Sequence, residues 1–257
     1  MSPDLLHLIA NPMNASPSQQ APLLNQWHQP IGDPLPQWQA RPLPTRLQLH
    51  GRYCRLEPID AGQHAQDLFD AYADAPDGSD WTYMASGPFD HADSYRQYAA
   101  QLQQSHDPLH FAVIDLASGR AVGSLALMRI DARNGVIEVG HVALSRRLKR
   151  TRVATEAQFL LMRYAFDTLG YRRYEWKCDS LNAPSRHAAQ RLGFSFEGIF
   201  RQAIVYRARS RDTAWFSIID GEWPTLRTAF DAWLDPANFD GDGQQRQSLA
   251  ALRGNQL

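Results

Sequence analysis

Five basic residues fall within seven positions of one short stretch, SRRLKRTRVATEA (Ser145–Ala157), between Arg146 and Arg152. An apolar, strand-like run precedes the stretch, and a helix-forming pattern follows it. A strand that leads through a turn into a helix leaves free backbone N–H groups at the helix N-terminus, where the helix dipole also favours anions. The stretch is therefore typical of a phosphate-binding turn, a DNA-contacting arm or a solvated charged turn.

The charge of the whole chain bears on these alternatives. Twenty-six Lys and Arg residues stand against 27 Asp and Glu residues, which gives a formal net charge of −1. Binding to DNA needs phosphate contacts spread over a larger basic surface. The near-neutral balance disfavours the DNA-contacting arm, while the phosphate-binding turn and the solvated turn both remain open.

Other motifs for nucleotides, metals or covalent catalysis are missing from the sequence. Neither G-x-x-x-x-G-K-[ST] nor G-x-G-x-x-G occurs. The nine histidines form neither H-E-x-x-H nor a Cys/His set with zinc spacing, so no metal is expected. His141 and His187 stand alone, and packing is favoured over catalysis for both. No G-x-S-x-G turn supplies a covalent nucleophile.

The elements around the basic stretch predict an α+β fold with a mostly antiparallel sheet flanked by helices. The predicted order is strand, two helices, several antiparallel strands, then helix, strand, helix and the last strands. Asp60 and Asn182 are N-cap candidates, and Gly170 and Gly193 are stop signals. We expect a Pro-rich N-terminal extension over residues 1–45 that wraps over the domain or stays mobile. A compact domain is expected over 46–235, with a weakly structured C-terminal tail over 236–257.

The cysteines and the apolar runs indicate a compartment. Cys54 and Cys178 are the only cysteines and lie in strand-like segments, which favours reduced, buried thiols. No apolar run approaches the ~18 residues of a membrane span. The first residues lack a basic region followed by a long apolar core, so a signal peptide is not expected. The default expectation is the cytoplasm.

Two further motifs accompany the basic stretch. The run ATEA opens the predicted helix, and a second helix begins with Asn-x-x-Ser (Asn182 to Ser185) and ends in RLGF. With these motifs, the segment 136–198 resembles the central motifs of the GNAT acyltransferases, and it is closest to their ribosomal-protein N-acetyltransferase (RimJ/RimL-like) branch. The strand order upstream fits the same family back to about Thr45. The resemblance implies transfer of an acetyl group from acetyl-CoA to a primary amine by direct attack.

The resemblance also implies where acetyl-CoA would bind. The basic turn would cradle its pyrophosphate with backbone amides, and the preceding strand would run beside its pantetheine arm, with amides near Val142 polarising the thioester carbonyl. The implied binding residues are Val142, Ala143, Leu144, Lys149, Arg150, Thr151, Arg152, Val153, Ala154, Asn182 and Ser185. One residue departs from the family pattern, because Arg152 stands at the position of the usual glycine. The turn must then suit L-residues, and its arginines can grip phosphate directly.

Direct attack requires an amine that has lost its proton. Glu138 is the first candidate for the base, and the alternative is that this carboxylate only pairs with a neighbouring arginine. Ser185 is the best candidate to protonate the leaving thiolate, with Tyr206 as a weaker one. A backbone N–H could stabilise the oxyanion.

The acceptor amine stays open between small molecules and protein N-termini. We expect residues 80–89 and 206–215 to shape its pocket, with the N-terminal extension as a possible lid. A possible homodimer is also expected, with no membrane partner and no nucleic acid. The competing interpretation is a non-catalytic acyl-CoA-binding or sensor module on the same fold, because a fold does not fix a function.

Overall fold

The computed structural model describes residues 22–254 and divides the chain into two compact units, 1–39 and 40–257. In the smaller unit, the described residues form one short antiparallel hairpin of β1 (Leu23–Leu24) and β2 (Pro30–Ile31). Trp27 lies between these strands with 70% of its surface exposed. The wrapping expected for residues 1–45 stays a prediction, and its first 21 residues lie outside the described part.

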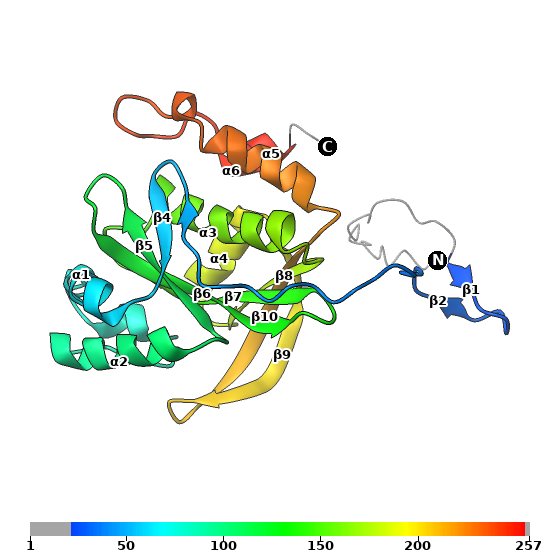
Figure 1. The fold of residues 1–257 in the computed structure, drawn as a ribbon, viewed down its shortest axis with the longest axis horizontal. Helices are drawn as coiled ribbons and strands as arrows, with labels where there is room; N and C mark the ends of the chain where they lie inside the picture. Colours follow the sequence, from blue (N-terminus) through cyan, green and yellow to red (C-terminus); the bar gives the residue numbers. More distant parts are fainter. Residues whose placement is uncertain (1–21, 255–257) are drawn as a thin grey trace, which may run out of the picture. The chain divides into compact units, whose positions relative to one another are not determined.

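The larger unit confirms the α+β prediction. Its sheet has eight strands in the order β3-β4-β5-β6-β7-β8-β10-β9, antiparallel throughout except for the pair β7–β8 (Figure 1). The strands are β3 (Leu49–His50), β4 (Cys54–Pro58), β5 (Leu109–Asp115), β6 (Ala121–Asp131), β7 (Val136–Leu144), β8 (Arg173–Asp179), β9 (Ser195–Tyr206) and β10 (Arg209–Ile219). The helices are α1 (Ala61–Ala73), η1 (Gly78–Trp81), α2 (Ala92–Gln104), α3 (Arg152–Arg163), the π-turn η2 (Tyr164–Thr168), α4 (Ala183–Leu192), α5 (Trp223–Trp233), η3 (Pro236–Asn238) and α6 (Leu249–Gly254).

Helices cover both faces of this sheet. Along β5, Phe111 and Val113 join the core cluster that includes α3 and α5, whereas Ala112 and Ile114 join the cluster beneath α1 and α2. This alternation is the period of two that a strand buried on both sides requires. The N-caps predicted at Asp60 and Asn182 are confirmed, since their side chains accept from backbone N–H groups of α1 and α4.

The two parallel strands of the sheet, β7 and β8, stop pairing about halfway along their length. β7 and β8 pair from Val136↔Arg173 to Val139↔Trp176, and no pair follows. Beyond that point β7 stays with β6 as far as Leu144, while β8 stays with β10. Residues 140–144 of β7 therefore face β8 with backbone groups that the ladder does not use.

A bulge in β7 accounts for this parting. Between Gly140 and Ala143, β7 advances three residues while β6 advances two, so β7 carries one extra residue. His141 lies in this bulge with a left-handed backbone, at φ 48°. A bulge bends its strand and increases the local twist, which turns the end of β7 away from β8. Gly140 lies beside it and leaves room for the Met128 side chain, since a Cβ there would lie 2.3 Å from Sδ of Met128 and would push that side chain aside.

A buried carboxylate ties α3 to the turn before β4. The two oxygens of Glu156 accept from the backbone N–H groups of Arg52, Tyr53 and Cys54, each at 2.7 Å. A Cβ on Gly51 would lie 2.5 Å from the same carboxyl group, so only glycine fits opposite it. This interaction explains the glutamate of the ATEA run and fixes the start of α3 against the sheet.

The C-terminal region differs from the prediction. Residues 236–254 were expected to be weakly structured, but they form η3 and α6, and Leu249 is only 1% exposed within the main core. The composition of this segment is polar, and one buried leucine anchors it. None of the helices within residues 22–254 has the length and apolar character that a membrane crossing requires.

Replacing Glu156 by Gln should lower the free energy of unfolding by about 3 kcal/mol, because the amide cannot accept three charge-assisted hydrogen bonds and would place an NH₂ group against backbone donors. Urea unfolding followed by far-UV circular dichroism measures the change. Asp90→Asn is the matched control, since Asp90 is exposed. Equal unfolding midpoints for Glu156→Gln and the control would contradict this role.

Candidate functional site

The turn between β7 and α3 is held by its own side chains. Ser145 is 1% exposed and its Oγ donates to the Val122 carbonyl, while its own carbonyl accepts from the N–H groups of Leu148 and Lys149. Thr151 caps α3, with Oγ1 accepting from the N–H of Ala154 at 3.2 Å and donating to the carbonyl of Leu148 at 2.7 Å. The turn is thus preformed.

Among the open backbone N–H groups of this turn, three lie at or just before the start of α3. Within residues 22–254, the N–H groups of Arg150, Arg152 and Val153 have no hydrogen-bond partner, whereas those of Lys149, Thr151 and Ala154 are used inside the turn. The open donors lie at the N-terminus of a 12-residue helix, whose dipole adds partial positive charge. The geometry is that of an anion-binding turn. The donors at the start of α3 come from three residues, fewer than the six (149–154) that the resemblance implied.

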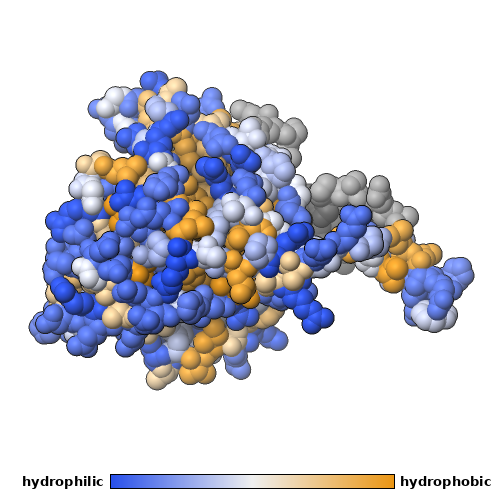
Figure 2. Space-filling model, in the orientation of Figure 1, coloured by the Kyte–Doolittle hydropathy of each residue, from blue (hydrophilic) through white to orange (hydrophobic). Residues whose placement is uncertain are grey.

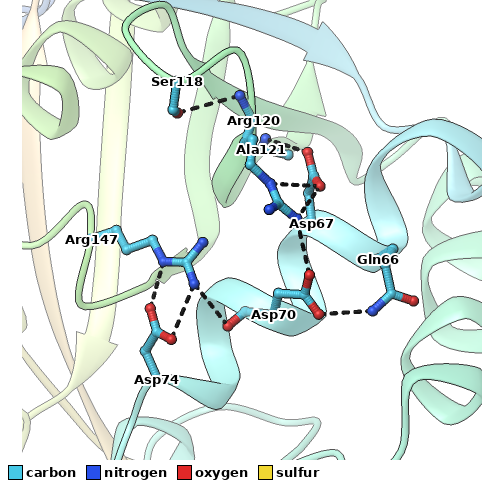
Figure 3. Close-up of polar contacts among 8 residues, drawn as sticks. All are labelled: Gln66, Asp67, Asp70, Asp74, Ser118, Arg120, Ala121 and Arg147. Carbon is cyan, nitrogen blue, oxygen red and sulfur yellow. Dashed lines mark hydrogen bonds and ion pairs between the residues drawn. The ribbon is translucent and has the colours of Figure 1, made fainter.

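Two of the basic side chains in the turn have a structural partner. Arg147 pairs with Asp74 and donates to the carbonyl of Asp70, which fastens the turn to the end of α1 (Figure 3). Lys149 pairs with Asp80. These two charges are therefore largely neutralised within the fold.

Three arginines of the stretch remain, namely Arg146, Arg150 and Arg152, and the last two differ in conformation and contacts. Arg152, which stands where the resembled family usually has glycine, is the first residue of α3, and its guanidinium lies 4.4 Å from the ring centre of Tyr53. The left-handed residue is Arg150, at φ 64°. Within the described residues, Arg150, like Arg146, has no hydrogen bond, ion pair or ring contact, and it lies next to the open N–H groups at the start of α3, where its guanidinium can meet an anion.

The Asn-x-x-Ser motif lies at the end of β8. The side-chain oxygen of Asn182 accepts from the N–H of Ser185 at 3.1 Å, so Asn182 is a helix cap. Oγ of Ser185 accepts from Nε1 of Trp176 at 3.0 Å. The hydroxyl proton of Ser185 is thus left for donation, and the Cys178 thiol is its acceptor. Burial raises the pKa of the nearby Cys178 thiol, and the hydrogen bond from Ser185 opposes this shift.

Glu138 is enclosed in an ion-pair cluster on the opposite face of the sheet from α3. Its Oε2 lies 2.8 Å from Nζ of Lys177 and 3.4 Å from Nε of Arg129, and Lys177 also bonds Glu175 at 2.6 Å. Both partners of the first pair have side chains only 7% exposed, and Lys177 lies over the ring of Trp215 at 3.8 Å. Burial raises the pKa of Glu138, and Lys177 opposes the rise. The carboxylate is thus paired, mainly to a lysine.

Tyr206 is also engaged. Its hydroxyl donates to Oδ2 of Asp179 at 2.9 Å, and burial together with this carboxylate raises the pKa of Tyr206. Next to it, Arg207 and Arg209 donate to the carbonyls of Trp81 and Thr82 at 3.0 and 2.7 Å. The β9–β10 turn therefore holds the loop that includes η1.

A pocket with aromatic walls lies between α1, α2 and the sheet, beside the bulge of β7. The space between its walls is about 240 Å³ with open solvent included, and the cavity itself has a volume of about 10 Å³, room for about one water molecule. Its lining contains no carboxylate and no basic side chain other than histidine. The lining residues are Tyr72, Trp81, Met84, Tyr95, Tyr98, Leu102, His110, Ser124, His141 and Ala143.

Sequence reasoning missed most of this pocket. The loop 80–89 was expected at such a pocket, and Trp81 and Met84 do line it. His110 and His141 lie 31 positions apart, and the structure places their ring centres 5.0 Å from each other. His141 was assigned to packing, and no local signal marks the bulge that turns it into the pocket. Among residues 22–254, no group of three or more His, Cys, Asp or Glu side chains could hold a metal ion.

Residues 54–195 match the family model described as an acetyltransferase (GNAT) domain. The chain is similar to a solved GCN5-related N-acetyltransferase from Brucella melitensis, with 50% sequence identity, a TM-score of 0.84, and coverage of 86% of this chain and 100% of that chain. A second solved structure, titled a probable acetyltransferase (GNAT family), from Chromobacterium violaceum ATCC 12472, shows 41% identity, a TM-score of 0.70, and coverage of 76% and 98%. A curated relative from Bacillus subtilis (strain 168), "Putative ribosomal N-acetyltransferase YdaF", is 26% identical over 170 residues, or 65% of this chain and 90% of that protein.

Replacing Lys177 by Met should lower the free energy of unfolding by about 3–5 kcal/mol at neutral pH, because two buried carboxylates then lack their shared cation. Burial would then raise the pKa of Glu138 further, so the folded state would hold a proton that the unfolded chain has released. Stability lost at about pH 7 should therefore return as the pH falls toward 5. Urea unfolding at both pH values measures this.

Lys149→Met is the matched control, because Lys149 and Asp80 form a pair with side chains 41% and 30% exposed. Its loss should stay below about 1 kcal/mol. A loss for Lys177→Met that is no larger than this, or that does not shrink at the lower pH, would show that the cluster does not depend on Lys177.

Proposed function

This chain belongs to the GNAT acetyltransferase family, in its RimJ/RimL-like branch, and on this premise we propose that the parting of β7 and β8 binds acetyl-CoA beside a pocket for the acceptor amine. Acetyl-CoA is the co-substrate of the family, and it supplies the acetyl group as a thioester. The proposed acetyl-CoA site depends on residues 140–144, whose backbone groups have no partner on β8. These residues lead directly into the turn with the three open N–H groups at the start of α3.

The pyrophosphate would bind at the turn. The N–H groups of Arg150, Arg152 and Val153 are the proposed donors, and the guanidinium of Arg150 adds charge. Lys149, Thr151 and Ala154 would act by holding the shape of the turn, because their N–H groups are already bonded. This arrangement fits a doubly charged group at a helix N-terminus without needing glycine at position 152.

The pantetheine arm would lie along the end of β7. The proposed contacts are the backbone groups of Val142, Ala143 and Leu144, with the N–H near Val142 directed at the thioester carbonyl. The carbonyl of Ala143 already accepts from the hydroxyl of Tyr72 at 3.2 Å, so this strand also connects to the pocket. A backbone donor fixed in advance stabilises the developing oxyanion without reorganisation.

Asn182 and Ser185 would act where the thiol leaves. Ser185 is the proposed proton donor to the thiolate, because its oxygen accepts from Trp176 and its proton would turn from the Cys178 thiol to the thiolate. Asn182 orients the first turn of α4 under Ser185.

The ion pair between Glu138 and Lys177 favours a structural role for this carboxylate. A role of Glu138 as the base stays a prediction. Glu138→Gln tests it, because loss of the base should slow turnover and leave the binding of CoA unchanged.

We propose that the acceptor enters the aromatic pocket. Pockets with aromatic walls and no carboxylate bind apolar groups better than polycations. The acceptor is then a primary amine carried on a compact apolar or aromatic group, on a small molecule or at a protein N-terminus, and a polyamine fits less well.

Location and assembly are also proposals. The two free cysteines are buried, as is usual in a reducing compartment, and this supports the cytoplasm.

The edge strand β9 supports a homodimer, and Figure 2 shows apolar surface over the β9–β10 hairpin. The exposed apolar side chains of β9 are Phe196, Ile199, Phe200, Ile204 and Val205. Sedimentation velocity of the wild type and Phe200→Lys tests the dimer, which the added charge should dissociate.

The enzymatic proposal is tested by incubating the chain with acetyl-CoA and a panel of amines and N-terminal peptides while free thiol is measured. Thiol release that depends on an amine, with a preference for aromatic amines over spermidine, is the expected result. Thermal stabilisation by CoA without thiol release from any amine would instead indicate a non-catalytic acyl-CoA-binding module.

Arg150→Gly should weaken the binding of acetyl-CoA about tenfold, the equivalent of one charge-assisted contact. Glycine adopts the same left-handed backbone without a Cβ, so the open N–H groups keep their positions and only the guanidinium is lost. Isothermal titration calorimetry measures the dissociation constant. Acetyl-pantetheine, which lacks the pyrophosphate, is the control ligand and should bind both proteins equally; unchanged affinity of the variant for acetyl-CoA would exclude a phosphate contact by Arg150.

A further inference from the structure

Two imidazoles in the aromatic pocket lack a protein partner. His110 is 2% exposed, and its ring meets that of His141 edge to face, at 75°. Within residues 22–254, neither ring forms a hydrogen bond or an ion pair. His64, by contrast, is bonded on both nitrogens, to Glu57 and to the N–H of Asp60. Buried polar groups normally have partners, so a pair left open inside a pocket is suited to a ligand.

The backbone directs His141 to the reacting region. It lies in the bulge of β7 with a left-handed backbone, at φ 48°. This conformation costs free energy for most residues other than glycine. Asparagine, aspartate and histidine adopt it more readily than other side chains do. The neighbour of His141 two residues on, Ala143, lines the same pocket and lies on the strand segment that no longer pairs with β8. His141 therefore lies between the proposed acceptor pocket and the proposed thioester position.

We propose that His141 is the base that accepts the proton of the acceptor amine. The proposal rests on the proposed function. The ammonium group of the acceptor gives one proton to the imidazole, and the free amine nitrogen bonds the carbonyl carbon as the carbon–sulfur bond breaks. The second proton leaves the nitrogen and ends on the thiolate, which yields the amide and the free thiol, and the imidazolium returns its proton to solvent.

The surroundings keep both imidazoles neutral. Burial lowers the pKa of His141, and burial followed by the neighbouring imidazole lowers the pKa of His110 to about 4. Burial raises the pKa of Tyr72 to about 12, so this hydroxyl stays uncharged. A neutral imidazole can accept a proton at neutral pH, as a base must. The titratable or charged groups that face the pair are Tyr72 of α1, Tyr95 and Tyr98 of α2, and Arg46, which also lowers the pKa of His110.

Glu138 is less suited to this step. Its carboxylate is bound by Lys177 at 2.8 Å and by Arg129 at 3.4 Å, and it does not line the pocket. Taking a proton would neutralise the buried partner of Lys177 and leave that cation with Glu175 alone. His141 loses no ion pair when it accepts a proton.

The test compares two nucleophiles with the wild type and His141→Asn. Asparagine tolerates the left-handed backbone, so the bulge is kept while the base is removed. Benzylamine is protonated at neutral pH and needs a base, whereas methoxyamine is already neutral. His141→Asn should release thiol from acetyl-CoA about 100-fold more slowly with benzylamine and at nearly the wild-type rate with methoxyamine.

Matched substitutions identify the residue. His106→Asn changes an exposed histidine before β5 and should keep both rates. The assignment of His141 would be overturned if His141→Asn slowed thiol release equally with both nucleophiles. It would also be overturned if Glu138→Gln or His110→Phe, but not His141→Asn, slowed thiol release with benzylamine alone. Failure of the wild type with both nucleophiles would overturn the proposed function itself, and with it the base. Binding of CoA and the unfolding midpoint, measured for each variant, exclude misfolding as the cause of a loss.

Discussion

One extra residue in β7 is the constraint on which the rest of the site depends. Parallel strands such as β7 and β8 would otherwise continue side by side, with every backbone group between them bonded. The bulge ends this pairing after Val139 and leaves residues 140–144 with unused polar groups. The same bulge turns His141 into a pocket on one face of the sheet. A single local irregularity thus yields a backbone suited to an extended ligand and a side chain beside it.

The second requirement is that the turn after β7 keeps its shape without a ligand. Its charges are divided between structure and binding: Arg147 and Lys149 neutralise carboxylates near α1 and η1, while Arg150 stays unpaired within the described residues. Glu156 holds the first turns of α3 against the β4 edge of the sheet. A preformed site of this kind loses little conformational entropy when the ligand binds. The basic stretch is therefore neither a uniformly solvated run nor a polycationic arm.

The sequence was sufficient for the features that depend on neighbouring residues. Caps such as Asp60 and Asn182, and the family motifs around α3, are set by local chemistry, and the fold class followed from them. Features that depend on distant pairing were not predictable. The bulge exists only as a mismatch between β7 and β6, and the ring that His141 contacts, His110, comes from β5. The left-handed backbone of Arg150 was not predictable either, since the path of the whole turn decides which residue takes this conformation.

The most direct test of this account is a crystal structure of the chain with a thioether analogue of acetyl-CoA. The account predicts that the pyrophosphate accepts hydrogen bonds from the N–H groups of Arg150, Arg152 and Val153, and that the pantetheine arm follows residues 140–144 with the acyl group facing His141. An analogue bound elsewhere, or with its acyl group remote from the pocket of His110 and His141, would contradict it.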